Sequence, residues 1–121
     1  MKLKPFNNQS TKGEACEKLA CDYLKKNGLK LVEKNFHSRH GEIDLIMQHQ
    51  ETLVFIEVRY RESQDFGGAK ASITPAKQNK IRKTALYYMQ TKGREINARI
   101  DVVAMTGKLK IPNIEWIKNA F

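Results

Sequence analysis

The sequence contains no apolar run that approaches the roughly 20 residues of a membrane-spanning helix. Its first residues, Met1–Phe6, lack the apolar stretch of a signal peptide. We therefore expect a cytoplasmic protein that neither inserts into nor crosses a membrane. Internal repeats and low-complexity tracts are also absent, so the 121 residues predict one domain over 1–121, with a polar lead-in over 1–11.

Cysteine is scarce, with only Cys16 and Cys21 in the chain. Five residues of helix place two side chains about 140° apart around the helix axis, so the two thiols face different ways. The spacing is also not C-x-x-C, and it predicts neither a disulfide framework nor a cysteine zinc site. We interpret both as buried or half-buried thiols in a reducing compartment.

The charge is unevenly distributed along the chain. Lysine and arginine number 22 against 13 acidic residues, which gives a net charge of +9. Residues 1–40 carry +5 and residues 76–121 carry +7, whereas residues 41–75 carry −3. Basic flanks around an acidic centre are typical of a protein that binds a polyanion with its flanks and a cation in the middle. Solubility alone explains the charge equally well.

The spacing of polar and apolar residues predicts a helix, three strands, a second helix and two more strands. The expected elements are a helix from the Thr11–Glu14 capping box to Asn27-Gly28, strands over 29–35, 42–48 and 52–60, a Pro75–Lys92 helix capped by Thr74, and strands over 98–105 and 111–117. Residues 36–41 and 61–74 are expected to be loops, the second of them mobile. This order predicts an α/β fold with a central mixed sheet flanked by helices.

The two central strands form a predicted hairpin around a turn between Gln50 and Glu51. This turn pairs residues whose numbers sum to 101, and one face of the hairpin is then entirely apolar. The apolar pairs are Ile43 with Val58, Leu45 with Ile56, and Met47 with Val54. On the other face, Glu42 opposite Arg59 is an ordinary cross-strand ion pair.

The same register places Asp44 opposite Glu57. Their Cβ atoms would be about 4.5–5.5 Å apart, and like charges at this separation destabilise a sheet unless they share a proton or a cation. Two carboxylates at this spacing suit Mg²⁺ or Mn²⁺. The alternative is an exposed face on which both charges are solvated, but the neighbouring Ile46 and Phe55 indicate that a helix covers it.

Two segments of this hairpin, GEIDLI at 41–46 and VFIEVRYR at 54–61, resemble the YraN-like family of small bacterial restriction-endonuclease-like proteins. The resemblance extends over nearly the whole chain, through Gly13-Glu14-Ala15, Tyr23-Leu24, Gly28, Asn35, Gly67-Gly68, Lys77, Lys80, 99–103 and Ala120-Phe121. It implies a restriction-endonuclease-like core of the PD-(D/E)xK nuclease superfamily, similar to archaeal Holliday-junction resolvases. The predicted order of elements fits that core.

By this resemblance, Asp44 and Glu57 are the metal ligands, and Arg59 takes the place of the motif lysine. A further carboxylate from the first helix, Glu14 or Glu17, is the additional acidic contributor. The implied activity is hydrolysis of DNA phosphodiesters with Mg²⁺ or Mn²⁺ as cofactor. Arginine cannot act as a general base, although it can bind phosphate through two hydrogen bonds. The alternative is therefore a non-catalytic nucleic-acid-binding module with a degenerate nuclease site.

Further candidates for nucleic-acid contacts are basic or lie near the hairpin: Arg61, His40, Lys77, Lys80, Arg82 and Lys83. The basic run of the second helix is either a platform for backbone phosphates or a solvated helix face. The glycine pair at 67–68 would let the loop after Arg61 close over a substrate.

Other residues are given structural roles. The spacing of the three histidines does not predict a metal site, and Trp116, Tyr87 and Tyr88 lie in periodic apolar segments that predict core positions. Asp101 is either a metal ligand or a structural partner of Arg99 or of a backbone group.

The expected partner is nucleic acid, DNA in particular and branched DNA by the resemblance. No base-reading motif is present, so the sequence does not exclude RNA. Enzymes that cleave junctions usually need two active sites, so a homodimer would support that use.

Overall fold

The computed structural model describes residues 12–93 and 95–121. The elements are α1 (Lys12–Lys26), β1 (Lys30–Ser38), β2 (Gly41–His49), β3 (Thr52–Arg61), the short 3₁₀ turns η2 (Asp65–Gly67) and η3 (Lys70–Ser72), α2 (Pro75–Lys92), β4 (Ala98–Thr106) and β5 (Asn113–Ile117). The predicted order of two helices and five strands is confirmed. The predicted lead-in and the Thr11 cap lie outside the described residues.

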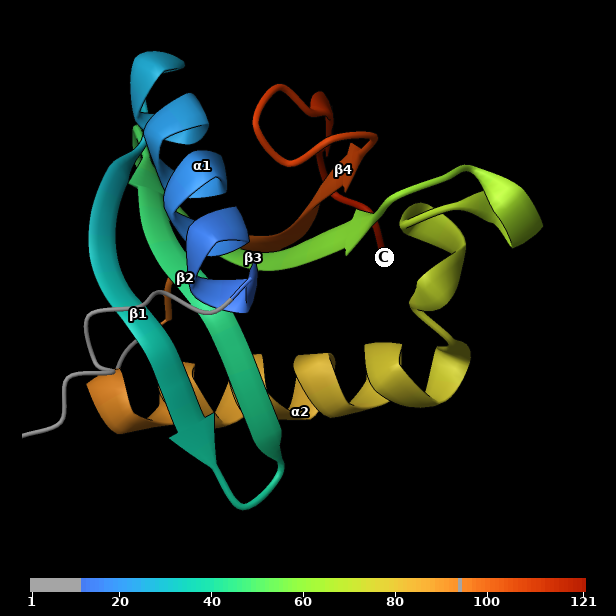
Figure 1. Cartoon of the computed structure of the whole chain (residues 1–121). Coiled ribbons are helices and arrows are strands. Elements are labelled where there is room, and N and C mark those ends of the chain that lie inside the picture. Colours follow the sequence, from blue (N-terminus) through green and yellow to red (C-terminus); the bar gives the residue numbers. More distant parts are fainter. Residues whose placement is uncertain (1–11, 94) are drawn as a thin grey trace, which may run out of the picture.

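The five strands form one mixed sheet in the order β1-β2-β3-β4-β5. The β3–β4 pair is parallel and all others are antiparallel. The two helices lie on opposite faces of the sheet (Figure 1). This arrangement is compatible with the predicted restriction-endonuclease-like core.

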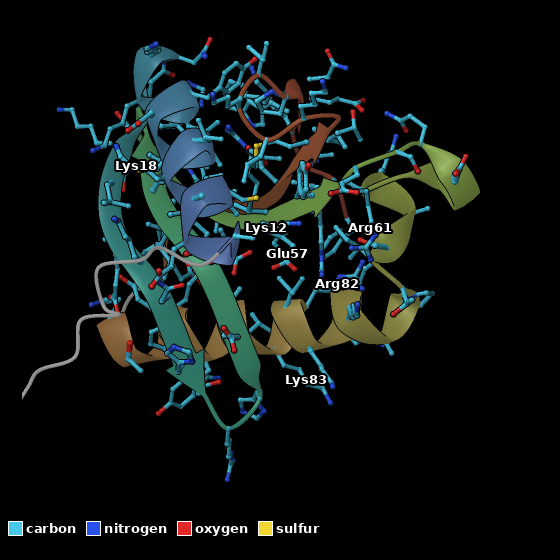
Figure 2. The ribbon with its side chains drawn as sticks, in the orientation of Figure 1. Lys12, Lys18, Glu57, Arg61, Arg82 and Lys83 are labelled. Carbon is cyan, nitrogen blue, oxygen red and sulfur yellow. The ribbon has the colours of Figure 1, made fainter. Side chains whose placement is uncertain are left out.

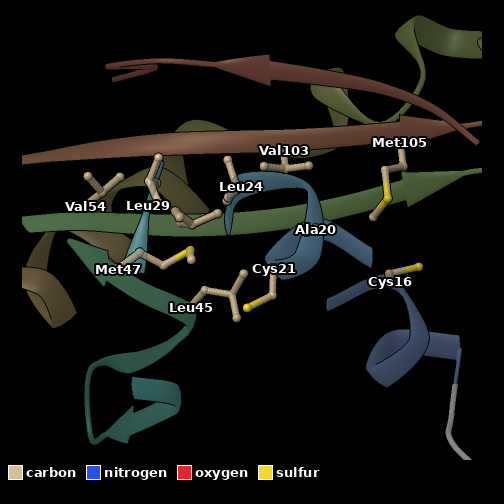
Figure 3. Packing of buried hydrophobic residues seen from close by; sticks show 11 residues of the cluster. Cys16, Ala20, Cys21, Leu24, Leu29, Leu45, Met47, Val54, Val103 and Met105 are labelled. Carbon is tan, nitrogen blue, oxygen red and sulfur yellow. The ribbon is translucent and has the colours of Figure 1, made fainter. Parts of the chain in front are cut away.

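One face of the sheet packs against α1. The buried side chains of α1 are Cys16, Ala20, Cys21 and Leu24. They meet alternate residues of the central hairpin, Leu45, Met47, Val54 and Ile56 (Figure 3). Both thiols are buried and free, as predicted.

The other face packs against α2. Ala85 and Tyr88 form a buried cluster with Ile46 and Phe55, which confirms that a helix covers this face. The hydroxyl of Thr74 caps α2 by accepting a hydrogen bond from the Lys77 backbone N–H at 3.3 Å, as predicted. None of the helices in the described part of the chain is long and apolar enough to cross a membrane.

Two predicted loops are wrong in extent. β1 continues to Ser38 instead of ending at Asn35, because the residues from Phe36 to Ser38 pair with the start of β2. Phe36 also packs edge-on against Tyr88, with ring centroids 5.0 Å apart. The segment 61–74 was predicted as a mobile loop, but it contains two 3₁₀ turns and buries Ala69 and Ile73.

The three aromatic residues that were predicted to lie in the core differ in their burial. Tyr88 is buried, whereas the ring of Tyr87 is 41% exposed and the prediction of a core position is wrong there. Trp116 is half-buried and donates a hydrogen bond to Asp101 at 2.9 Å.

Candidate functional site

The predicted hairpin register is confirmed from the turn up to Leu45 and Ile56, where the paired residues still sum to 101. The pairing of β2 with β3 ends at Leu45 and Ile56. Ile43 packs in the α2 cluster instead of on the α1 face, so its predicted pairing with Val58 is wrong. β2 therefore departs from β3 next to Asp44.

Close packing between β2 and α2 accompanies this departure. Gly41 has a φ of +147°, and a Cβ at this position would lie 3.3 Å from the Thr84 hydroxyl and 3.7 Å from Lys80 Cβ. A side chain here would be strained at this φ and would crowd the Thr84 hydroxyl. The glycine therefore suits the close approach between the β2 segment that carries Asp44 and the helix that carries Lys80.

Asp44 and Glu57 lie side by side, and their side chains share a hydrogen bond. The backbone N–H of Val58 also donates a hydrogen bond to Asp44 Oδ2, at 2.8 Å. Burial and the Asp44 charge raise the pKa of Glu57 to about 8. Burial also raises the pKa of Asp44, although the Val58 N–H and Arg59 oppose this change. The two carboxyl groups are thus held together with less than two full negative charges.

Arg59 contacts Glu57 and not Glu42, so the predicted Glu42–Arg59 pair is wrong. Its guanidinium lies 2.7 Å from Glu57 Oε2, whereas the Glu42 carboxylate lies 3.9 Å from His37 Nδ1. Arg59 Nε is buried and has no hydrogen-bond acceptor among the described residues. A buried donor without an acceptor costs about 1–3 kcal/mol, so this atom is a candidate contact for an anion.

Of the two α1 carboxylates that the sequence offers as the additional acidic contributor, the structure brings Glu17 to the pair. The Glu17 side chain hydrogen-bonds with Asp44 and with the side chain of Asn35, and burial followed by the Asp44 charge raises its pKa. Glu14 is exposed and does not line the pocket described below. Asn35 was not predicted as a site residue; it adopts a φ of 51° within β1, a conformation that the sequence pattern did not reveal.

Glu17, Asp44, Glu57 and Arg59 line a pocket of about 580 Å³ between α1, the central hairpin and α2. Figure 2 shows Glu57 in this region, near Lys12. The acidic lining residues are Glu17, Glu42, Asp44 and Glu57, and the basic ones are Lys12, Arg59, Arg61, Lys77 and Lys80. Lys12 was not predicted, because its position at the start of a helix carries no distinguishing pattern. The pocket therefore combines paired carboxylates with surrounding cations.

Three predicted nucleic-acid contacts lie outside this pocket. Arg82 stacks over the ring of Phe121 at 5.2 Å, and Lys83 is exposed on the side of α2 away from Glu57 (Figure 2). His40 lies with its ring centroid 5.9 Å from that of Tyr87.

Asp101 is a structural residue. Its buried carboxylate accepts hydrogen bonds from Arg99, Trp116 and the backbone of Asn119, and Arg99 in turn contacts His49. Within residues 12–93 and 95–121, no three His, Cys, Asp or Glu side chains are arranged to hold a metal ion.

The model of the uncharacterised protein family UPF0102 matches residues 16–105, a segment that contains Asp44, Glu57 and Arg59. The chain belongs to the UPF0102 family. The UPF0102 protein of Colwellia psychrerythraea is 50% identical to it over 99% of this chain and 96% of the relative. That of Nitrosococcus oceani is 49% identical over 98% and 97%, and one from Coxiella burnetii is 50% identical over 89% of each chain. UPF0102 membership confirms the YraN-like resemblance.

The carboxyl pair of this UPF0102 protein predicts a pH-dependent stability. Asp44, Arg59 and Lys77 all act on Glu57, and the pKa of Glu57 lies at about 8 against an ordinary value of 4.5. The folded protein therefore holds an extra proton between these pH values, and the stability from this group is lost as the pH rises through that range. The wild type should lose stability as the pH rises, whereas Glu57→Gln should not. The melting temperature of Glu57→Gln minus that of the wild type should therefore increase by roughly 5–10 °C from about pH 5 to pH 9 in EDTA.

The matched control is Glu42→Gln, which removes an exposed carboxylate from the same pocket. Its melting temperature should follow the wild-type pH profile. A constant difference between Glu57→Gln and the wild type across this pH range would contradict the assignment.

Proposed function

We propose that this UPF0102 protein binds nucleic acid and is a metal-dependent endonuclease that hydrolyses DNA phosphodiesters, with branched DNA as the expected substrate. The observation that carries the proposal is the hydrogen-bonded Asp44–Glu57 pair in a pocket lined by five cations. A phosphodiester is anionic and its hydrolysis adds negative charge, so it requires both a cation site and positive surroundings. A cytoplasmic location belongs to this proposal, and both cysteines are free thiols.

The donor set fits Mg²⁺ or Mn²⁺. Both are hard cations that prefer oxygen ligands, and Mg²⁺ commonly takes only one or two protein carboxylates and completes its coordination with water. Asp44 and Glu57 would hold the ion, with Glu17 adjacent to Asp44. When bound, the ion would supply Lewis-acid activation of the phosphate and of an attacking water.

The surrounding side chains would bind and orient the phosphates. Arg59 is fixed against Glu57 and can offset the charge that develops on the reacting phosphate, but it cannot take the proton of the attacking water. Lys77 and Lys80 project from α2 into the same pocket and suit contacts to neighbouring phosphates. Lys12 at the start of α1 and Arg61 at the end of β3 complete the positive lining.

The test is a cleavage panel with the purified protein. Single strands, duplexes, flaps and four-way junctions are incubated with Mg²⁺, Mn²⁺ or EDTA, at low and at physiological salt. We expect cleavage that requires the metal, together with binding that weakens as salt increases. Absence of cleavage from every substrate with either metal would overturn the enzymatic part of the proposal.

The second candidate is a nucleic-acid-binding module without catalysis. It is favoured by the 2.7 Å contact of Arg59 with Glu57, because a guanidinium bound to a Glu57 oxygen competes with a metal ion for that oxygen. This candidate predicts salt-sensitive binding without cleavage in the same panel. Arg59→Lys would then identify the cause, since cleavage by the lysine variant would show that the arginine had silenced the site.

A further inference from the structure

An exposed aromatic ring lies on α2 beyond the carboxylate pocket. Tyr87 is 41% exposed, whereas the neighbouring Tyr88 is 3% exposed. The ring centroid of Tyr87 lies 5.9 Å from that of His40 and 6.3 Å from that of Phe36, so the β1–β2 hairpin borders it on one side. An aromatic ring that is supported by neighbours and still accessible can offer a surface for stacking.

Tyr87 lies on the same face of α2 as the lysines of the pocket. At 100° per residue, Lys77, Lys80 and Tyr87 fall within about 80° of one another around the helix. Lys80 is followed by Tyr87 at a rise of about 10 Å along the helix axis. A strand of nucleic acid whose phosphate contacts Lys80 in the pocket would therefore reach the ring within a few nucleotides.

The charge around this ring favours an anionic partner. α2 contains no acidic side chain along its whole length, and Lys83 lies one turn before Tyr87. Arg39 is exposed in the hairpin turn next to His40. Aromatic rings interleaved with cations are the combination that binds single-stranded nucleic acid, in which a base stacks on the ring and cations follow the phosphates.

The position of the ring is held by the fold. Gly41 permits the hairpin to approach Thr84 and Lys80, and Phe36 of the hairpin packs against Tyr88 with ring centroids 5.0 Å apart. Figure 1 shows the β1–β2 hairpin crossing α2 and extending beyond it. The hairpin and the helix thus form one support for the ring.

We propose that Tyr87, bordered by His40, is a stacking site for an unpaired base of a DNA strand that leads into the carboxylate pocket. This inference rests on the proposed function and names its substrate class: DNA with a single-stranded segment next to the bond that is cleaved. Bases within a duplex stack on one another, so their faces are not available to the ring. The site therefore selects single strands and flaps over continuous duplex.

The test measures binding in EDTA, so that no cleavage is required. Dissociation constants for a fluorescent single strand, a flapped duplex and a blunt duplex are obtained by anisotropy for the wild type and Tyr87→Ala. We expect Tyr87→Ala to weaken binding of the single strand and of the flap by roughly 5- to 100-fold, because base stacking on an aromatic ring has about this value. Binding of the blunt duplex should change by less than about twofold, because its stacked bases do not use the ring.

Two controls separate stacking from folding and from charge. Tyr87→Phe keeps the ring and should bind as the wild type does, and Leu86→Ala removes a 56% exposed side chain from the adjacent position without effect on binding. In a salt titration, Tyr87→Ala should keep the wild-type slope of log K against log salt. Lys80→Ala should reduce that slope by about 0.7 for a single strand, because it removes one phosphate contact.

The outcomes distinguish this inference from the proposed function. Wild-type binding to both single strand and duplex, with Tyr87→Ala weakening neither or weakening both equally, would overturn the stacking site and leave the proposed function standing. Failure of the wild type to bind any of the three substrates would overturn both.

Discussion

Replacing Asp44 by asparagine is expected to lower metal-dependent cleavage by about 10³-fold or more while the protein stays folded. The carboxylate is one of two that would hold the cation, and loss of Lewis-acid activation removes several kcal/mol of transition-state stabilisation. The asparagine side-chain oxygen can still accept the hydrogen bond that Val58 N–H donates to Asp44 Oδ2. The change also removes one of two neighbouring buried acids, so in EDTA the variant should be as stable as the wild type or more stable near pH 8.

Two measurements separate metal binding from catalysis. Thermal unfolding is followed with and without Mn²⁺: a ligand that binds the folded state stabilises it, so the wild type should gain melting temperature and Asp44→Asn should not. Glu42→Gln is the matched control, because Glu42 lines the same pocket but its carboxylate is exposed and directed to His37. It should keep the metal-induced shift and cleavage within about tenfold of the wild type. Cleavage by Asp44→Asn at the wild-type rate would place the active site elsewhere.

Most of the fold could be predicted because each element carries its own local pattern. The turn at Gln50 and the alternating apolar residues of β2 and β3 leave one register that buries a complete face, and that register is the observed one from the turn to Leu45 and Ile56. Thr74 followed by Pro75 likewise identifies the start of α2, since both act within a single helical turn.

The details of the candidate site depend on tertiary packing and were less predictable. The departure of β2 from β3 at Ile43 breaks the alternation, and it accompanies the close packing of Gly41 against α2. The choice between Glu14 and Glu17 depends on how α1 is rotated about its axis on the sheet. The spacing of residues along the sequence does not determine that rotation. The same is true of Tyr87: adjacent helical residues differ by about 100°, and only one of two neighbouring tyrosines can face the core.

Asp101 shows how structure resolves an alternative that the sequence left open. An aspartate on a strand next to the site strand can be a ligand or a structural partner, and the two cannot be separated by pattern. In the structure its carboxylate is fully buried and each oxygen accepts hydrogen bonds from protein donors. Asp101 therefore joins β4 to β5 and to the C-terminal residues.

Asp101→Ala is accordingly expected to cost about 3–5 kcal/mol of unfolding free energy, or roughly 10–20 °C in melting temperature. The substitution leaves the Arg99 guanidinium without its 3.0 Å carboxylate partner, and it leaves Trp116 Nε1 and the backbone N–H of Asn119 without acceptors. Partly buried donors that lose their acceptors account for most of this cost.

Denaturant titration of Asp101→Ala measures this loss, and Asp22→Ala is the control because its carboxylate forms only an exposed ion pair with Lys18 on α1. The control should change stability by less than about 1 kcal/mol. Asp101→Asn keeps one oxygen acceptor for the Asn119 N–H but not the charge opposite Arg99, so it should fall between the two. An Asp101→Ala protein as stable as the control would show that the Arg99 and Trp116 contacts contribute little. If Asp101→Ala were less stable than the wild type only in the presence of Mn²⁺, Asp101 would be a metal ligand instead of a structural residue.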